Sequence, residues 1–137
     1  VLFAQNKSKS EALEEANRVA DKFGIGNIRD VNAGNLDLFQ VKQVSLARLY
    51  ATNAQVFLLD EPFAGLTKEE IEDIEQLIKE VLHEEDQTIV VIDHNFDTLV
   101  DFTERILILN NGRLLADDLP EQVKANPDVQ RIYLGET

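Results

Sequence analysis

Two short hydrophobic runs separated by a helix-like stretch constrain the fold of this chain more than any other feature. Residues 55–59 are largely apolar, and residues 88–92 are all β-branched. Between them, Thr67 and Glu70 have the spacing of a capping box, and isoleucines follow at helical intervals. A strand, a helix and a second strand in this order predict parallel pairing, and continuous hydrophobic runs are typical of buried parallel strands. The sequence therefore predicts an α/β domain with a mostly parallel sheet flanked by helices.

Further elements are predicted on both sides of this unit. Apolar residues at helical intervals predict a helix over 8–23, with capping-box spacing between Ser8 and Glu11 and with Gly24 at its C-terminal end. The segment 24–35 is rich in Gly, Asn and Asp and is predicted to be a loop. The core face of the helix after Thr67 is predicted to be Ile71, Ile74, Ile78, Val81 and Leu82. The remaining predicted elements are a helix over 39–51, a short helix over 96–100, a hairpin formed by 106–109 and 114–116, and helices opened by Pro120 and Pro127.

The composition narrows the possible functions. The 137 residues provide enough chain for one domain with a real core, and no apolar run reaches the roughly 18 residues of a spanning helix. The chain contains no cysteine, which excludes disulfides and thiolate metal sites. Its net charge of −13 argues against a nucleic-acid-binding surface, because phosphate contacts need clustered Lys and Arg. Because the chain begins at Val1 and contains no methionine, we expect a piece of a longer protein or a processed product.

Polar side chains follow directly on both predicted strands. Asp60 and Glu61 come after the first strand, and His94 comes near the end of the second. Open α/β sheets bind ligands at the carboxyl ends of their strands. There Asp60 can hold Mg²⁺, Glu61 can deprotonate a water that attacks a phosphoryl group, and His94 can hydrogen-bond a γ-phosphate. The alternative is that the acids are the solvated end of a strand and that the histidine is structural.

With these residues in place, the sequence resembles the ATP-binding subunit of ABC transporters over essentially its whole length. Residues 56–61 resemble the Walker B strand with its catalytic glutamate, and residues 92–94 (Ile-Asp-His) resemble the H-switch. Residues 63–67, with Gly65 in the middle, resemble the D-loop, which crosses the dimer interface in that family. The tail at 126–136 resembles the branched-chain amino-acid importer branch, and the lipopolysaccharide-export ATPases are similar there too.

This resemblance implies a fold, cofactors and site residues. The implied fold is a partial P-loop NTPase fold of the ABC ATPase type, with part of a helical subdomain. Residues 1–52 resemble the helical subdomain, and residues 53–137 resemble the C-terminal half of the ATPase core. The implied cofactors are ATP and Mg²⁺, with Asp60 as the metal ligand and with Glu61 and His94 as catalytic residues.

The signature motif of the family, Leu-Ser-Gly-Gly-Gln, is altered in this sequence. The matching segment consists of Leu36, Asp37, Leu38, Phe39 and Gln40. In the family, the serine and a glycine donate hydrogen bonds to the γ-phosphate that the opposite subunit binds. A carboxylate at Asp37 repels a phosphate by about 1 kcal/mol in water and by more in a drier interface. Either the segment is a degenerate signature in which Gln40 still contacts nucleotide, or Asp37 only begins a helix as its N-cap.

The phosphate-binding loop of the family, Gly-x-x-x-x-Gly-Lys-Ser/Thr, occurs nowhere in the 137 residues. That loop surrounds phosphates with backbone N–H groups and supplies a lysine and a Mg²⁺-binding hydroxyl. We therefore expect a C-terminal segment of the ATP-binding and ATP-hydrolysing component of an ABC transporter, inactive as an ATPase by itself. The expected partners are a membrane-spanning transporter subunit and a second ATPase subunit, at the cytoplasmic face of the membrane, and no nucleic acid.

Two other functions stay open at this point. A non-catalytic ABC-derived interaction or regulatory module accounts for the altered signature together with the missing loop. A non-transport ABC ATPase in DNA repair or translation accounts for the motifs, but not for the acidic composition or the importer-like tail. In either case, a sheet without the strand of the missing loop has an unpaired edge. We therefore expect the isolated chain to self-associate or to pair with a second polypeptide.

Overall fold

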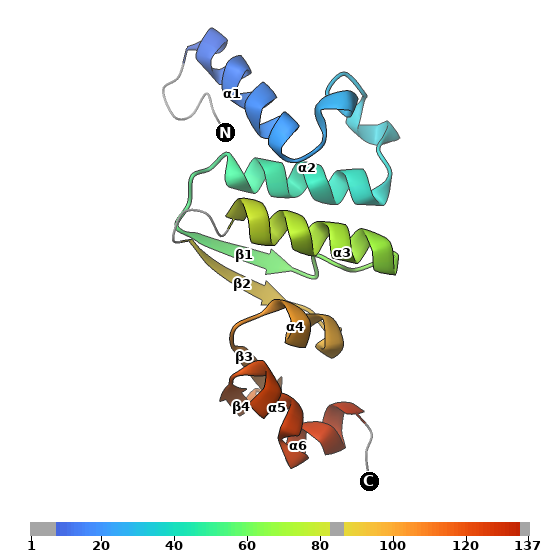
Figure 1. The fold of residues 1–137 in the computed structure, drawn as a ribbon, viewed down its shortest axis with the longest axis vertical. Coiled ribbons are helices and arrows are strands. Elements are labelled where there is room, and N and C mark those ends of the chain that lie inside the picture. Colours follow the sequence, from blue (N-terminus) through green and yellow to red (C-terminus); the bar gives the residue numbers. More distant parts are fainter. Residues whose placement is uncertain (1–7, 83–86, 135–137) are drawn as a thin grey trace. The chain divides into compact units, whose positions relative to one another are not determined.

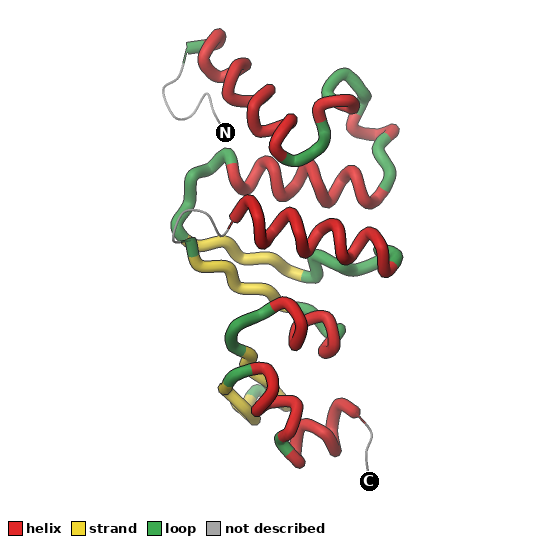
Figure 2. The backbone as a smooth tube through the Cα atoms, viewed as in Figure 1, coloured by secondary structure: helices red, strands yellow, loops and turns green. Residues whose placement is uncertain are grey.

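The structure, a computed structural model, describes residues 8–82 and 87–134 and divides the chain into two compact units, 1–92 and 93–137. Figure 1 shows the order of the elements, and Figure 2 distinguishes helices from strands. The first unit contains α1 (Lys9–Lys22), 3-10 turns at Gly26–Ile28 and Ala33–Asn35, α2 (Leu38–Tyr50), β1 (Val56–Asp60), α3 (Lys68–Leu77) and β2 (Thr88–Ile92). The second unit contains α4 (Phe96–Phe102), β3 (Ile106–Asn110), β4 (Arg113–Asp118), α5 (Pro120–Ala125) and α6 (Pro127–Val129). These units do not test the predicted boundary after residue 52, which stays a prediction.

The helices of the first unit begin at capping boxes. Ser8 and Glu11 cap α1, and Thr67 and Glu70 cap α3, in each case with both reciprocal hydrogen bonds. Each pair satisfies two backbone donors that the first helical turn leaves unpaired, so the local sequence fixes where the helix starts. Gly24 follows α1 with a φ of +67°, a left-handed conformation that glycine adopts at little cost. These helix starts, and the glycine that ends α1, are confirmed as predicted.

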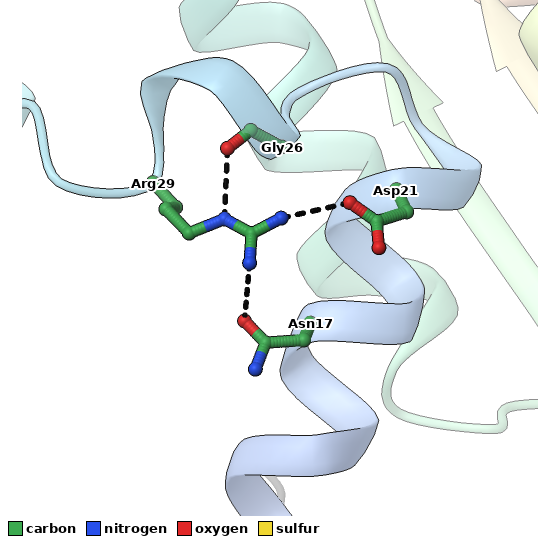
Figure 3. A network of polar contacts seen from close by, with 4 residues as sticks. All are labelled: Asn17, Asp21, Gly26 and Arg29. Carbon is green, nitrogen blue, oxygen red and sulfur yellow. Dashed lines mark hydrogen bonds and ion pairs between the residues drawn. The ribbon is translucent and has the colours of Figure 1, made fainter.

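One arginine holds the loop after α1 against that helix. The guanidinium of Arg29 donates to Oδ1 of Asn17 at 3.0 Å, to Oδ1 of Asp21 at 2.8 Å and to the backbone oxygen of Gly26 at 2.8 Å (Figure 3). The planar fork of an arginine can satisfy three such acceptors at once, which a lysine cannot do in the same geometry. The segment predicted to be a loop is therefore fixed to α1.

β1 and β2 pair in parallel, as predicted, and one face of the pair belongs to the core. Phe57 and Leu59 of β1 are buried on this face. α2 and α3 lie side by side (Figure 1), and Ile74 of α3 is fully buried. α3 continues into a wider, π-type turn at Ile78–Leu82, in which Ile78 is buried. Ile71 is half-buried, whereas the side chains of Val81 and Leu82 lie outside the described part of the structure.

The opposite face of the β1–β2 pair is open, which corrects the prediction that both strands are buried. Alternate residues on both strands are exposed, and paired residues of neighbouring strands point to the same side of a sheet. Within the first unit the described residues cover one face of the pair, whereas the hydrophobic runs had predicted cover on both. We call the exposed set the open sheet face, which consists of Val56, Leu58, Asp60, Thr88, Val90 and Ile92.

The second unit is built on an antiparallel hairpin. Asn111 and Gly112 join β3 to β4, with φ values of 48° and 74°. Positive φ at both central residues is the geometry of a type I′ turn, for which Asn-Gly is a preferred sequence. The hairpin and the helices around it share a core that consists of Phe96, Val100, Ile106, Ile108, Val123 and Val129. The predicted hairpin, the short helix before it and the helices that open at Pro120 and Pro127 are confirmed.

An ion pair across this hairpin makes the stability of the second unit depend on pH. The guanidinium of Arg105 donates hydrogen bonds to both carboxylate oxygens of Asp117, at 2.7 and 2.8 Å. These bonds lower the pKa of Asp117 below its ordinary value. Because the folded pKa is depressed, the stabilisation is present above the ordinary value of about 3.9 and is lost as the pH falls through the lower folded value. In Arg105→Ala we expect the pKa of Asp117, followed by NMR of its carboxyl carbon, to rise to the ordinary range; an unchanged pKa would contradict this role.

Candidate functional site

Two of the site residues predicted from the sequence, Asp60 and Glu61, lie at the carboxyl end of β1. Asp60 is the last residue of β1 and belongs to the open sheet face, and Glu61 follows directly outside the strand. Both residues are exposed. In the register of the sheet Asp60 pairs with Ile92, the last residue of β2, so the two strands end together. Two successive carboxylates therefore stand at the edge where parallel sheets bind ligands.

Glu61 has an unusual backbone conformation that its neighbours hold in place. Its φ is +45°, in the left-handed region that costs a residue with a side chain roughly 1–2 kcal/mol. The N–H of Glu61 donates to the carbonyl oxygen of Ile92 at 2.8 Å. The carbonyl oxygen of Glu61 accepts from the N–H of Ala64 at 3.3 Å and from the ammonium of Lys42 at 2.7 Å. Backbone strain of this kind, fixed by surrounding contacts, clusters at functional sites.

The turn after Glu61 packs against the start of α2. Gly65 has a φ of +79°, and a Cβ atom at this position would lie 2.8 Å from Cδ2 of Leu38. Both the backbone conformation and the close approach therefore favour glycine here. The segment that resembles the D-loop and the segment that resembles the signature motif are thus in contact within one chain.

Asp37 and Gln40 together cap the N-terminus of α2. Oδ1 of Asp37 accepts from the N–H of Gln40 at 2.8 Å, and Oε1 of Gln40 accepts from the N–H of Asp37 at 3.2 Å. The structure therefore shows the helix-starting role that was one of the two alternatives for Asp37. Leu38 is exposed beside this cap, and Leu36 and Phe39 are half-buried. A nucleotide contact by Gln40 stays a prediction, and in this chain its side-chain oxygen is engaged in the cap.

His94 lies two residues beyond β2, in the second unit. Its Nδ1 is 3.7 Å from Oδ1 of Asp93, which makes an ion pair only when the imidazole is protonated. The side chain of Asp93 is almost fully buried, and its Oδ1 accepts from the N–H of Asn95 at 3.0 Å. Its Oδ2 makes no hydrogen bond to any residue that the structure describes. The predicted combination of His94 with Asp60 and Glu61 spans both units and stays a prediction.

The carboxylate at the end of β1 has the chemistry of a ligand for a magnesium ion that also binds a nucleotide. Mg²⁺ is usually bound through one or two carboxylates, with water and substrate phosphates as the other ligands. Asp60 offers one exposed carboxylate of this kind. Within residues 8–82 and 87–134, no group of three or more His, Cys, Asp and Glu side chains could hold a metal by itself. The chemistry of the exposed Asp60 carboxylate is that of a single protein ligand to Mg²⁺.

Sequence reasoning missed Lys42 as a residue of this site. Lys42 lies 19 residues before Glu61, and the contact arises because α2 packs beside the turn after β1. No motif marks a lysine that reaches a backbone carbonyl at this separation. The left-handed conformation of Glu61 had no local sequence signal, because a following proline favours extended backbone in the residue before it.

Comparisons with known proteins agree with the resemblance to the ATP-binding subunits of ABC transporters. The family described as "Branched-chain amino acid ATP-binding cassette transporter" matches residues 113–137, which bears out the resemblance of the tail, although residues 135–137 lie outside the described structure. The high-affinity branched-chain amino acid transport ATP-binding protein LivG of Escherichia coli K12 is 35% identical over 130 residues, covering 95% of this chain and 51% of LivG. The lipopolysaccharide export system ATP-binding protein LptB of Haemophilus influenzae is 36% identical over 123 residues, covering 90% of this chain and 51% of LptB.

The comparison with solved structures agrees with the comparison of sequences. The crystal structure of the ADP conformation of MJ1267, an ATP-binding cassette of an ABC transporter, matches with a TM-score of 0.83 at 27% identity and covers 95% of this chain and 52% of that one. The predicted partial ABC ATPase fold is confirmed, and the chain spans about half the length of the relatives that it matches. Among the described residues, no helix is both long and apolar enough to cross a membrane. The chain is thus a relative of the ATP-binding proteins of ABC transporters, matched over nearly all of its own length and about half of theirs.

Proposed function

We propose that this chain is the C-terminal part of the ATP-binding and ATP-hydrolysing component of an ABC transporter. The observation that carries the proposal is the end of β1, where Asp60 and Glu61 follow a parallel strand and Glu61 is held in a left-handed conformation. The relatives LivG and LptB are named as ATP-binding proteins of a transport and an export system. Because the chain spans about half of such proteins, the activity belongs to a larger protein.

In that larger protein the residues at the strand ends have different tasks. When bound, ATP would supply the phosphoryl group, and Mg²⁺ would supply positive charge that neutralises the phosphate oxygens. Asp60 binds the metal, and Glu61 orients and deprotonates the attacking water. His94 hydrogen-bonds the γ-phosphate, and Gly65 belongs to the turn that meets a second ATPase subunit.

The proposed partners follow from the same assignment. A second ATPase subunit completes the nucleotide site, and a membrane-spanning subunit uses the free energy of ATP binding and hydrolysis from the cytoplasmic side of the membrane. The net charge of −13 is poorly suited to nucleic acid, because a phosphate backbone attracts clustered cations.

The open sheet face supports the existence of a further segment that completes the fold. Parallel sheets normally have both faces covered, yet Leu58 is 72% and Ile92 is 64% exposed. Relatives about twice as long have the additional chain that such cover requires. The phosphate-binding loop, which these 137 residues do not contain, is expected in the same segment.

A second candidate is a non-catalytic ABC-derived interaction or regulatory module. The observation that favours it is the cap of α2, in which the side chains of Asp37 and Gln40 each accept a hydrogen bond from the other residue's backbone N–H. The matching positions of the family's signature motif contact nucleotide instead. In such a module the start of α2 serves only to hold the helix and the turn at Gly65 together.

The test is a joined protein in which this chain replaces the matching half of LivG and follows the LivG segment that carries the phosphate-binding loop. We expect the joined protein to bind and hydrolyse ATP with Mg²⁺, and we expect no hydrolysis by the 137-residue chain alone, because it lacks that loop. Calorimetry measures the binding of ATP, and phosphate release measures its hydrolysis. Binding without hydrolysis would favour the non-catalytic module, and turnover by the chain alone would contradict the need for a further segment.

A further inference from the structure

We propose that Lys42 is a positioning residue for Glu61 and that α2, through this lysine, fixes where the Glu61 carboxylate lies. The inference rests on the proposed function, which assigns water activation to Glu61. The contact itself is independent of that function, since the ammonium of Lys42 donates to the carbonyl oxygen of Glu61 at 2.7 Å. Lys42 therefore acts on the backbone of Glu61.

The contact from Lys42 to the Glu61 carbonyl is short, at 2.7 Å. The N–H of Ala64 also donates to this oxygen, at the longer distance of 3.3 Å. A hydrogen bond from an ammonium is charge-assisted and about twice as strong as one between neutral groups. Lys42 is half-buried, and the bond that it makes to the exposed Glu61 lies in a solvent-exposed position. Removing this donor takes away the shorter of these two bonds to the carbonyl.

The backbone of Glu61 needs such a contact because its conformation is not a preferred one. With a φ of +45°, the backbone of Glu61 has a higher conformational free energy than an extended or right-handed residue. Relaxation of φ turns the Cα–Cβ bond and moves the carboxylate with it. A displacement of about 1 Å at a reacting group can cost about 100-fold in rate. A lysine that holds the main chain therefore controls the geometry of the side chain.

A second contact joins the same two segments. Leu38 lies one turn before Lys42 on α2. A Cβ atom added at Gly65 would lie 2.8 Å from Cδ2 of Leu38, so the two residues pack closely. The start of α2 is itself fixed by the capping box of Asp37 and Gln40. The first turns of α2 and the turn after β1 are thus linked at two points, one polar and one apolar, and Lys42 provides the polar link.

The first test measures amide hydrogen exchange in the 137-residue chain by NMR. Lys42→Met keeps an unbranched apolar side chain but removes the charge and the donor. We expect the amide of Glu61, which bonds to Ile92, to exchange about tenfold faster, while amides within α3 keep their rates. Lys42→Arg, which retains a donor, is expected to restore most of the protection. Lys68→Met is the matched control, because Lys68 is exposed and its ion pair with Glu72 is loose, at 3.9 Å.

The second test uses the joined protein. We expect Lys42→Met to lower kcat about 10- to 100-fold with KM for ATP unchanged, and to add no further loss when Glu61→Gln is also present. Unchanged exchange at Glu61, or losses that add in the double variant, would overturn the role of Lys42. An unmodified joined protein that binds ATP without turnover contradicts the proposed function instead, and the exchange measurement still decides whether Lys42 holds Glu61.

Discussion

Glu61→Gln is expected to lower ATP turnover by the joined protein about 10²- to 10⁴-fold, the range that a positioned general base contributes. The glutamine retains the size of the side chain and the backbone bonds to Ile92 and Lys42, but it cannot accept a proton from water. The loss therefore falls on kcat, while KM and the affinity for ATP stay close to those of the unmodified protein. Steady-state phosphate release at saturating ATP and Mg²⁺ measures the first quantity, and calorimetry measures the second.

The matched control is Glu72→Gln, on α3 in the same compact unit. Glu72 is exposed and forms only a loose pair with Lys68 at 3.9 Å, so the same chemical change there removes one negative charge from the surface. Exposed pairs of this kind contribute less than about 1 kcal/mol, and we expect turnover to stay within about twofold. Equal losses in both variants would point to a general charge effect, and an active Glu61→Gln protein would remove Glu61 from the proposed mechanism.

The elements that the sequence predicts correctly are those with local signals. The pairs Ser8–Glu11 and Thr67–Glu70 satisfy helix donors within three residues, and Asn111 with Gly112 sets the hairpin turn by backbone conformation alone. The parallel pairing of β1 with β2 followed from two apolar runs that flank a helix. In the helix starts and the hairpin turn, the interactions that decide the structure lie close together in the chain, whereas β1 and β2 pair across the intervening α3.

The features that the sequence did not predict depend on how segments that are distant in the sequence pack against one another. The bond from Lys42 to Glu61 and the approach of Leu38 to Gly65 arise from the packing of α2 against a turn. The open sheet face was misjudged because a continuous hydrophobic run does not tell which face of a strand the other elements cover. The acids at the end of β1 were located correctly at a strand end, but their tasks depend on a ligand and on residues that the sequence pattern alone does not bring together.

Leu58→Lys is expected to weaken the self-association of the chain alone and to lower the stability of the joined protein. In the chain alone Leu58 is 72% exposed on the open sheet face, and a large apolar patch of this kind promotes association. We expect the unmodified chain to self-associate and the lysine to weaken this association about 10- to 100-fold, which corresponds to losing the burial of one leucine, about 1.5–3 kcal/mol. Sedimentation velocity over a range of concentrations measures the change.

In the joined protein the same position is expected to be covered by the added half, so that a lysine there is forced out of water. Burial of an ammonium without a partner costs several kcal/mol, and the urea midpoint of Leu58→Lys should fall accordingly. Leu59→Ala is the matched comparison, since Leu59 is only 5% exposed in the chain itself and its truncation should cost about 2–5 kcal/mol in both proteins. If the unmodified chain is monomeric at high concentration and the joined protein tolerates Leu58→Lys, the open sheet face is a true surface, and the segment that carries the phosphate-binding loop must pack elsewhere.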